Sequence, residues 1–473
     1  MDYLIEGGLV VTPKSQFKAD VYVSEGVIKA IGEDLKEKLE ISADAEVISA
    51  EGKYVLPGGV DVHVHFGAVS RGFASADDCQ SGGIAAALGG TTTIVEMMPQ
   101  QQGLPIWKSL EDWRERSVNS VVDYSCHVMV TGLTSELLKE IPLLVENGYT
   151  SFKVFLGTDD KRIDDFEFLS LLEATRGSGA VILVSAGNAG IEKYFTLRLL
   201  ETGKKDACYY VQSKPILGEI EGTSKAITLA EAAKVPIYFT HVSCREALRL
   251  VAAARQRGLP VFGETCPHYL LLSSEYYQRG GTEAAKYVVN PPLRERSQQG
   301  ELWRGLQSGS LDVIASDHCS FRLTGQKAIG ETFNDIPSGL PGIETRVPLL
   351  YSAGVGGGRL SLGRFVDLVA EMPARIFGLF PRKGAVAVGS DADLVIFDPG
   401  KEVELTCSSL HQKVDYCPYE GFRLKGYPEL TMLRGRVIAK RGEFVGQPGL
   451  GSFIPRKPFE ALAPGSGAFR LEV

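Results

Sequence analysis

The sequence predicts an α/β protein: a (β/α)8 TIM barrel with a small β-sandwich domain built from both chain termini. Three observations predict this fold. Eight short apolar runs follow one another, mostly at intervals of roughly 30 residues, the length of one βαβ unit. Helix-like segments separate these runs, and segments rich in strands and turns lie only near the two ends. Several of the apolar runs also end in histidine or aspartate, as strands around a barrel active site do.

Length and composition set the broad class of protein. The chain has 473 residues, a net charge of −8 and 53 glycines, which suits one large domain with many short loops and a smaller second domain. No long basic run exists, so nucleic acid and anionic membranes are poor candidate partners. We expect no signal peptide, because residues 1–6 lack its charged and apolar regions, and no run of about 18 apolar residues could span a membrane. The eight cysteines lack CxxC spacing, which favours reduced thiols in a cytoplasmic protein.

The two ends of the chain are predicted to form the β-sandwich together. Strand-like runs lie at residues 3–5, 8–11, 19–23 and 27–31, and again at residues 392–399 and 433–439. Neither end has enough strands for an independent domain. We therefore expect residues 1–56 to pair with residues 381–450, and we expect residues 451–473 to form a C-terminal tail.

The middle of the chain, residues 57–380, carries the barrel pattern. Its strand-like runs lie at residues 60–66, 90–97, 122–129, 151–156, 180–185, 235–241, 259–266 and 311–318. The helix-like segments between them include residues 229–234 and 244–255. The gap between the fifth and sixth runs exceeds a normal connection, which indicates an extra helix or loop. A doubly wound open sheet is the alternative, and the lack of a glycine-rich dinucleotide turn weakens it.

The first barrel strand presents two histidines on one face. His63 and His65 alternate with valines shortly after Pro57-Gly58-Gly59, and residues two apart on a strand point to the same side. Two adjacent imidazoles are a ready pair of metal ligands. An isolated His-x-His can equally be the polar face of a half-exposed strand.

Later strands end in further residues that suit a metal site. Lys153 lies on the fourth strand, His241 ends the sixth and Asp317 lies at the end of the eighth. The active site of such a barrel lies at these strand ends. Three of the seven histidines thus occupy this edge, which favours a metal site over a chance arrangement.

Lys153 is an unusual member of this group, because metal cations would repel a protonated ammonium. Burial beside Phe152 and Phe155 would lower the lysine pKa from about 10.4. The neutral amine can then take up CO₂ to give a carbamate, an anionic oxygen ligand able to bridge two metals. The alternative is a buried lysine paired with an acid.

Eight motifs run in order over nearly the whole chain, at residues 57–65, 89–93, 152–155, 240–243, 264–270, 291–294, 316–319 and 339–344. Together they resemble the cyclic amidohydrolases of the amidohydrolase superfamily, specifically the dihydropyrimidinase and hydantoinase family. Allantoinase and dihydroorotase are related members. The resemblance implies a metal-dependent hydrolase that opens a hydantoin- or dihydropyrimidine-like ring by means of metal-activated water.

The resemblance also implies a role for each site residue. His63, His65, carboxylated Lys153 and Asp317 would hold one metal, and the Lys153 carbamate with His241 would hold part of a second. Asp317 would also be the catalytic acid–base group. The cofactors would be one or two Zn²⁺ ions per chain, with Mn²⁺ as an alternative, and a CO₂-derived carbamate on Lys153. The resemblance further implies a homotetramer.

Two positions depart from the family pattern. The family usually carries His-x-Glu at the end of the fifth strand, where this chain has Ser185 and Gly187, so the second metal loses a histidine ligand. The family tyrosine five positions after the bridging lysine is Thr158 here. Asn290 and Ser338 stand at positions that line the family's ring-binding site, largely through backbone groups.

We expect a metal-dependent hydrolase of small cyclic amides. One alternative is a catalytically silent, dihydropyrimidinase-like binding or scaffold protein, although the retention of five ligand residues favours an enzyme. Another is an allantoinase- or dihydroorotase-like activity with an altered metal site. The motif Asn290–Arg294 leans towards dihydroorotase, but no matching set of carboxylate-binding arginines is evident.

Overall fold

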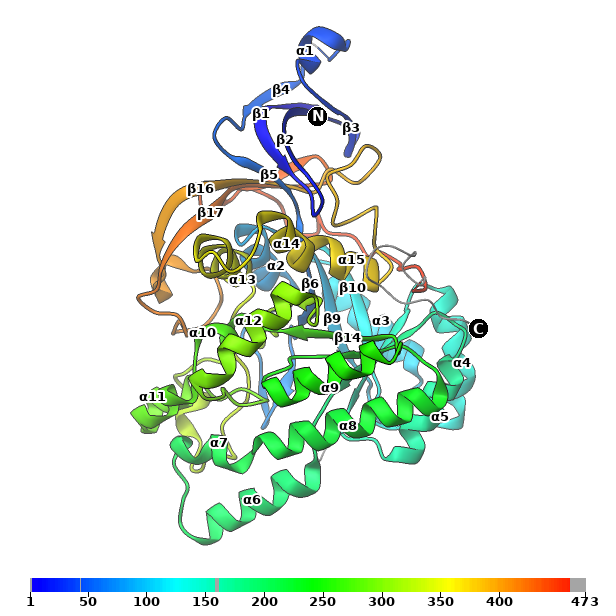
Figure 1. Cartoon of the computed structure of the whole chain (residues 1–473), viewed down its shortest axis with the longest axis vertical. Helices are drawn as coiled ribbons and strands as arrows, with labels where there is room; N and C mark the ends of the chain where they lie inside the picture. Colours follow the sequence, from blue (N-terminus) through cyan, green and yellow to red (C-terminus); the bar gives the residue numbers. More distant parts are fainter. Residues whose placement is uncertain (1, 43, 158–160, 460–473) are drawn as a thin grey trace.

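The computed structural model describes residues 2–42, 44–157 and 161–459. Figure 1 shows a barrel surrounded by helices, with a β domain that projects from one side of it. Eight strands form one sheet, and strands from both ends of the chain form another. The predicted fold class is therefore confirmed.

The eight-stranded sheet forms the barrel wall. In sheet order its strands are β6 (Gly59–Val64), β9 (Thr91–Pro99), β10 (Asp123–Met129), β11 (Ser151–Phe155), β12 (Val181–Ser185), β13 (Ile237–Phe239), β14 (Val261–Thr265) and β15 (Val313–Ile314). Neighbouring strands pair in parallel. The wall closes where Val64 pairs with His318. Parallel strands with both faces buried are nearly continuous apolar runs, and for this reason the sequence shows them clearly.

Helices cover the outside of the barrel. They include α2 (Cys79–Leu88), α3 (Ile106–Ser117), α4 (Ser135–Glu146), α5 (Asp165–Thr175), α9 (Arg245–Gln256), α10 (Pro267–Leu271), α11 (Gly281–Ala285), α12 (Gln299–Ser308), α13 (Arg346–Leu350), α14 (Leu362–Val366) and α15 (Met372–Ile376). Asp164 and Glu167 form a capping box at the start of α5, which satisfies two helix-end amides. No helix in the described ranges is long and apolar enough to cross a membrane.

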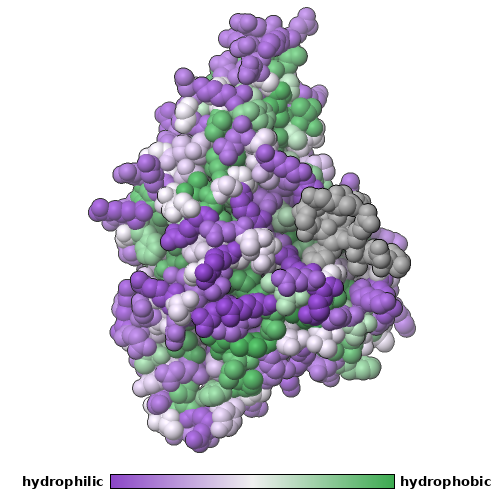
Figure 2. All heavy atoms as spheres, viewed as in Figure 1, coloured by the Kyte–Doolittle hydropathy of each residue, from purple (hydrophilic) through white to green (hydrophobic). Residues whose placement is uncertain are grey.

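The long connection between β12 and β13 carries α6 (Ala189–Glu201), α7 (Tyr210–Ser213) and α8 (Ile216–Ala233). The gap was expected to hold an extra helix or loop, and the structure shows extra helices there. In Figure 1, α6 lies at the end of the molecule opposite the β domain. Hydrophobic side chains gather on the surface near α8 (Figure 2), and Tyr194, Leu197 and Leu217 of this insertion are exposed.

The second sheet joins the two ends of the chain. Its strands are β1 (Tyr3–Val11), β2 (Gln16–Ser24), β3 (Val27–Gly32), β4 (Glu46–Ser49), β5 (Tyr54–Pro57), β16 (Leu394–Glu404), β17 (Arg423–Leu433), β18 (Arg436–Lys440) and β19 (Glu443–Phe444). The halves meet where β5 pairs antiparallel with β16, with Pro57 opposite Leu394. Ile5, Val21 and Met432 belong to one apolar core that draws on both halves. The domain boundaries given above stay predictions.

A buried ion cluster links this domain to the barrel. The Lys383 ammonium lies 2.5 Å from Asp123, 2.9 Å from Asp391 and 2.8 Å from Asp393, while Arg434 lies 2.6 Å from Asp123. Asp123 is the first residue of β10, whereas Asp393 and Arg434 flank strands of the terminal sheet. The three carboxylates are close enough together to hold a metal, but the Lys383 ammonium lies among them. We call these five residues the Lys383 cluster.

The described part of the predicted tail packs against the barrel. The Tyr124 amide donates to the Ser452 carbonyl at 3.0 Å, and the Ile454 amide donates to the Tyr124 carbonyl at 2.8 Å. The Ile454 side chain joins the apolar cluster that includes Val62 and Leu183 of the barrel strands. The start of the tail therefore belongs to the folded core.

Candidate active site

A cavity of about 730 Å³ lies at the C-terminal ends of the barrel strands. The predicted site residues that line it are His63, His65, Lys153, Ser185, His241, Asn290, Asp317 and Ser338. Thr158 lies outside the described residues. Much of the remaining wall is apolar, with Phe66, Met97 and Met129 among its members. Residues separated by more than 250 positions in the chain thus meet around one space.

Three of these residues form a compact cluster. His63 Nε2 lies 3.2 Å and His65 Nε2 lies 3.3 Å from Asp317 Oδ1. One donor atom from each residue lies within 4.8 Å of the others. Two imidazoles and one carboxylate are a donor set that binds divalent metal ions. The residues present therefore fit a metal.

The backbone is strained at two of the strand ends. His241, after β13, has a φ of +43°, and Asp317, after β15, has a φ of +50°. Residues with a Cβ rarely adopt this left-handed region, and such strain clusters at functional sites. Its presence at these two positions supports the assignment of the site.

Glu264 is a central residue that the sequence analysis did not single out. Its Oε1 contacts His63 Nδ1 and accepts the His241 amide at 3.1 Å, and its Oε2 accepts the Tyr238 hydroxyl at 2.7 Å. The carboxylate thus places the His63 ring proton on Nδ1. Nε2, which faces Asp317, then carries a lone pair that can bind a metal. Its position at the end of the seventh strand, within the motif at residues 264–270, is the signal that could have identified it.

Burial and neighbouring charges shift the titration of the cluster. Burial lowers the pKa of His65 to about 4 and holds the pKa of His241 well below its usual value. Both imidazoles are therefore neutral, which is the form that binds metals. Burial alone would raise the pKa of the Asp317 carboxyl, but the His63 ring and the hydrogen bond with His65 hold this pKa well below its usual range. Asp317 is therefore ionised at neutral pH.

Lys153 is fully buried in the cavity wall. Its amine donates to Thr240 Oγ1 and lies 5.3 Å from the centre of the Phe155 ring. Within the described part of the chain no ion pair is found for this amine, although the Glu264 and Asp317 carboxylates lie near enough to act on it electrostatically. Burial lowers the pKa of Lys153 to about 8, which increases the fraction of neutral amine.

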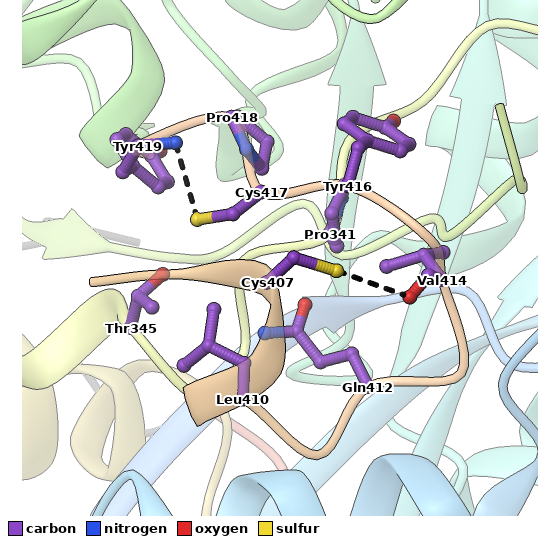
Figure 3. A pocket seen from close by; sticks show the side chains of 10 residues that line it. All are labelled: Pro341, Thr345, Cys407, Leu410, Gln412, Val414, Tyr416, Cys417, Pro418 and Tyr419. Atoms are coloured by element: carbon purple, nitrogen blue, oxygen red, sulfur yellow. Dashed lines mark hydrogen bonds between the residues drawn. The ribbon is translucent and has the colours of Figure 1, made fainter. Parts of the chain in front are cut away.

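Another cavity, shown in Figure 3, is much smaller. It measures about 10 Å³ and lies between the β16–β17 connection, which carries Cys407 and Tyr416, and the barrel residues Pro341 and Thr345. This volume suits about one water molecule. It cannot hold a ring substrate.

Comparisons with known proteins identify the family. The model of the amidohydrolase family matches residues 224–438. The chain is 42% identical over 466 residues to a D-hydantoinase of Geobacillus stearothermophilus, and the match covers 98% of each chain. The chain belongs to the hydantoinase and dihydropyrimidinase family of cyclic amidohydrolases.

Solved structures of hydantoinase relatives have the same fold. A dihydropyrimidinase from Brevibacillus agri NCHU1002 matches with a TM-score of 0.95 and 39% identity, over 97% of this chain and 100% of that chain. An L-hydantoinase (dihydropyrimidinase) from Arthrobacter aurescens matches with a TM-score of 0.87 and 29% identity, over 96% of this chain and 100% of that chain. The whole molecule, and not only the barrel, is therefore shared with the family.

The departure from the hydantoinase pattern at the end of β12 has a structural counterpart. Ser185 Oγ lies 3.1 Å from His241 Nε2. A Cβ at Gly187 would lie 2.9 Å from Gly157 Cα and 3.0 Å from Glu192 Oε1, so no side chain fits there. The Glu192 carboxylate, which pairs with Lys214, occupies the space beside Gly187. An acid from α6 thus lies next to the position where the family has one on the strand end.

Proposed function

We propose that this protein is a metal-dependent hydrolase that opens a small cyclic amide ring of the hydantoin or dihydropyrimidine type. The cluster of His63, His65 and Asp317, beside the buried amine of Lys153, carries this proposal. It lies at the edge of the barrel where such enzymes have their active sites. The high identity to a D-hydantoinase over nearly the full chain supports the same substrate class.

The metal would be Zn²⁺, one or two ions per chain, with Mn²⁺ as an alternative. His63, His65, Asp317 and carboxylated Lys153 would hold the first ion, and His241 with the Lys153 carbamate would hold the second. The Lys153 amine would form a bond to the carbon of CO₂ and release one proton, which gives the anionic carbamate. When bound, such an ion lowers the pKa of water from 15.7 towards about 7 and polarises the ring carbonyl.

The residues of the chain would provide the proton transfers and the orientation of the ring. Asp317, ionised and buried, would accept the proton of the attacking water and deliver it to the leaving ring nitrogen. Glu264 would hold His63 in its ligand tautomer. Asn290 and Ser338 would orient the ring, and Thr158 stays a further predicted substrate contact.

The alternatives make different predictions. A silent binding or scaffold protein has no need of five intact ligand positions around a cavity of about 730 Å³. An allantoinase- or dihydroorotase-like enzyme would instead show a strong preference for allantoin or dihydroorotate. The homotetramer and the cytoplasmic location stay predictions, and size-exclusion chromatography with light scattering would test the first.

Protein expressed with added zinc should contain about one or more equivalents of metal per chain, as three or four protein ligands normally ensure. It should hydrolyse at least one of hydantoin, 5-monosubstituted hydantoins of either hand, and dihydrouracil. Removal of the metal by a chelator should abolish hydrolysis, and added Zn²⁺ or Mn²⁺ should restore it. Elemental analysis and a spectrophotometric ring-opening assay measure both quantities, with Asp317→Asn as the inactive control. A metal-free preparation that stays inactive after metal addition would refute the proposal.

Ser185→His should raise the number of tight zinc sites from one to two. With Ser185 the second ion would have only the Lys153 carbamate and His241 as firm ligands, whereas zinc sites generally use three or four. Zinc titration of the metal-free proteins against a chromophoric chelator counts these sites. Ser185→Ala is the matched control and should bind the same number of ions as the wild type. If the wild type already holds two ions as firmly as the histidine variant, Ser185 changes the space available to the substrate and not the number of bound metal ions.

A further inference from the structure

His318 is a buried residue to which the proposed reaction gives no role. It directly follows Asp317, is 0% exposed and does not line the large cavity. Its carbonyl accepts the His65 amide at 2.8 Å, and its amide donates to Ser316 Oγ at 3.1 Å. The main chain of His318 thus lies between two residues of the metal cluster, where the barrel wall closes.

The contacts of the His318 ring determine its tautomer. The amides of Gly342 and Ile343 donate to Nδ1 at 3.1 and 3.4 Å. Because backbone amides can only donate, Nδ1 carries the lone pair and Nε2 carries the proton. His318 Nε2 lies 3.3 Å from Asp77 Oδ2, within ion-pair distance. Neither of these buried atoms has a hydrogen-bond partner with good geometry among the described residues, so each is the nearest polar group available to the other. The ring therefore joins the loop after strand β15 to the Asp77 carboxylate.

Asp77 connects this ring to the terminal domain. Its Oδ1 accepts the Lys413 amide at 3.0 Å and the Ser81 hydroxyl at 2.9 Å, and its own amide donates to Ser320 Oγ at 3.0 Å. Lys413 belongs to the connection between β16 and β17, which also lines the small cavity of Figure 3. The carboxylate thus has fixed partners in the barrel and in the terminal domain.

We infer that the Asp77–His318 pair positions Asp317 for catalysis and links it to the terminal domain. This inference rests on the proposed function of Asp317. The left-handed backbone of Asp317 is unfavourable by itself and persists only where the surroundings hold it. His318, the next residue in the chain, provides that support. Its ring contacts Asp77, and its carbonyl accepts a hydrogen bond from the His65 amide. Asp77 and His318 are positioning residues and need not touch the substrate.

Three variants test the pair, with a matched control. His318→Leu removes both ring contacts, whereas His318→Gln keeps one acceptor and one donor. Both oxygens of the Asp77 carboxylate can accept hydrogen bonds. In Asp77→Asn one oxygen becomes an NH₂ group, which must face either the Lys413 amide or the protonated Nε2 of His318, and both of these groups are donors. Asp78→Asn is the control, because the neighbouring Asp78 accepts from Lys413 Nζ at 3.1 Å and, among the described contacts of the molecule, has none with the ring of His318.

His318→Leu and Asp77→Asn should lower kcat by about 10- to 100-fold, which is the usual effect of losing a residue that orients a metal ligand. KM should stay within about threefold of the wild-type value. His318→Gln should recover most of kcat, and Asp78→Asn should match the wild type. In the Co²⁺-loaded proteins, the visible absorption spectrum should change for His318→Leu and Asp77→Asn but not for Asp78→Asn.

Equal losses in the leucine and glutamine variants, or wild-type kcat and spectrum in Asp77→Asn, would overturn the inference. If His318→Leu does not fold, the comparison of Asp77→Asn with Asp78→Asn decides the question. If the wild type opens no cyclic amide, the proposed function fails, and the Co²⁺ spectra still report whether the pair positions Asp317.

Discussion

Replacing Lys153 by alanine is expected to remove the metal and the activity together. The carbamate formed on Lys153 would be the one protein ligand shared by both metal positions, so its loss leaves neither ion with its full set of ligands. Metal ions contribute several kcal/mol of transition-state stabilisation, which corresponds to a loss of roughly 10³-fold in kcat/KM. Elemental analysis and the ring-opening assay measure the two effects on the same preparation.

Small carboxylic acids provide the rescue experiment for Lys153→Ala. Acetate or propionate can enter the space left by the lysine side chain and supply carboxylate oxygens, so both metal content and activity should be partly restored. Lys161→Ala is the matched control, because Lys161 lies near the same cavity but is partly exposed, and it should keep its metal. If Lys153→Ala retains the full metal content, the bridging role of Lys153 is wrong.

Replacing Lys383 by methionine should have the largest effect on stability. The Lys383 ammonium is fully buried among Asp123, Asp391 and Asp393, and methionine leaves these carboxylates close together without their shared cation. Removal of one partner from a buried ion pair typically costs about 3–5 kcal/mol, a large share of a total free energy of unfolding of about 5–15 kcal/mol. The first unfolding transition in urea, followed by circular dichroism, measures this cost.

The neighbouring residue supplies the control for Lys383. Arg382 lies 2.9 Å from Asp391, but its side chain is 50% exposed, and exposed ion pairs contribute about 0–1 kcal/mol. Arg382→Gln should therefore shift the urea transition only slightly. Equal shifts in the two variants would show that burial does not account for the contribution of the Lys383 cluster to the free energy of unfolding.

The barrel could be predicted from the sequence because its strands are short, nearly continuous apolar runs, the pattern of a parallel sheet that is buried on both faces. The strand β17, residues 423–433, was not predicted over most of its length. Gly426 and Pro428 interrupt its alternation, and both residues are normally depleted in strands. Its place in the sheet depends on pairing with β16 and β18.

The sequence predicted those site residues whose own side chains are typical metal ligands. It missed the residues whose role depends on contacts with distant parts of the chain. His63, His65, Lys153, His241 and Asp317 stand at strand ends and carry recognisable ligand groups. Glu264 acquires its role only from contact with His63, 201 positions away. The pairing of His318 with Asp77 likewise depends on how the closed barrel meets the terminal domain, which no local pattern encodes.

The divided terminal sheet has a consequence for the order of events during synthesis. The strand β5 leaves the ribosome long before its partner β16, because the whole barrel is made between them. At about 5–20 residues per second, the delay is roughly 20–70 s. During that time the β5 edge exposes unpaired backbone groups that can pair with another chain. The N-terminal strands therefore reach their final partners only after β16 has left the ribosome.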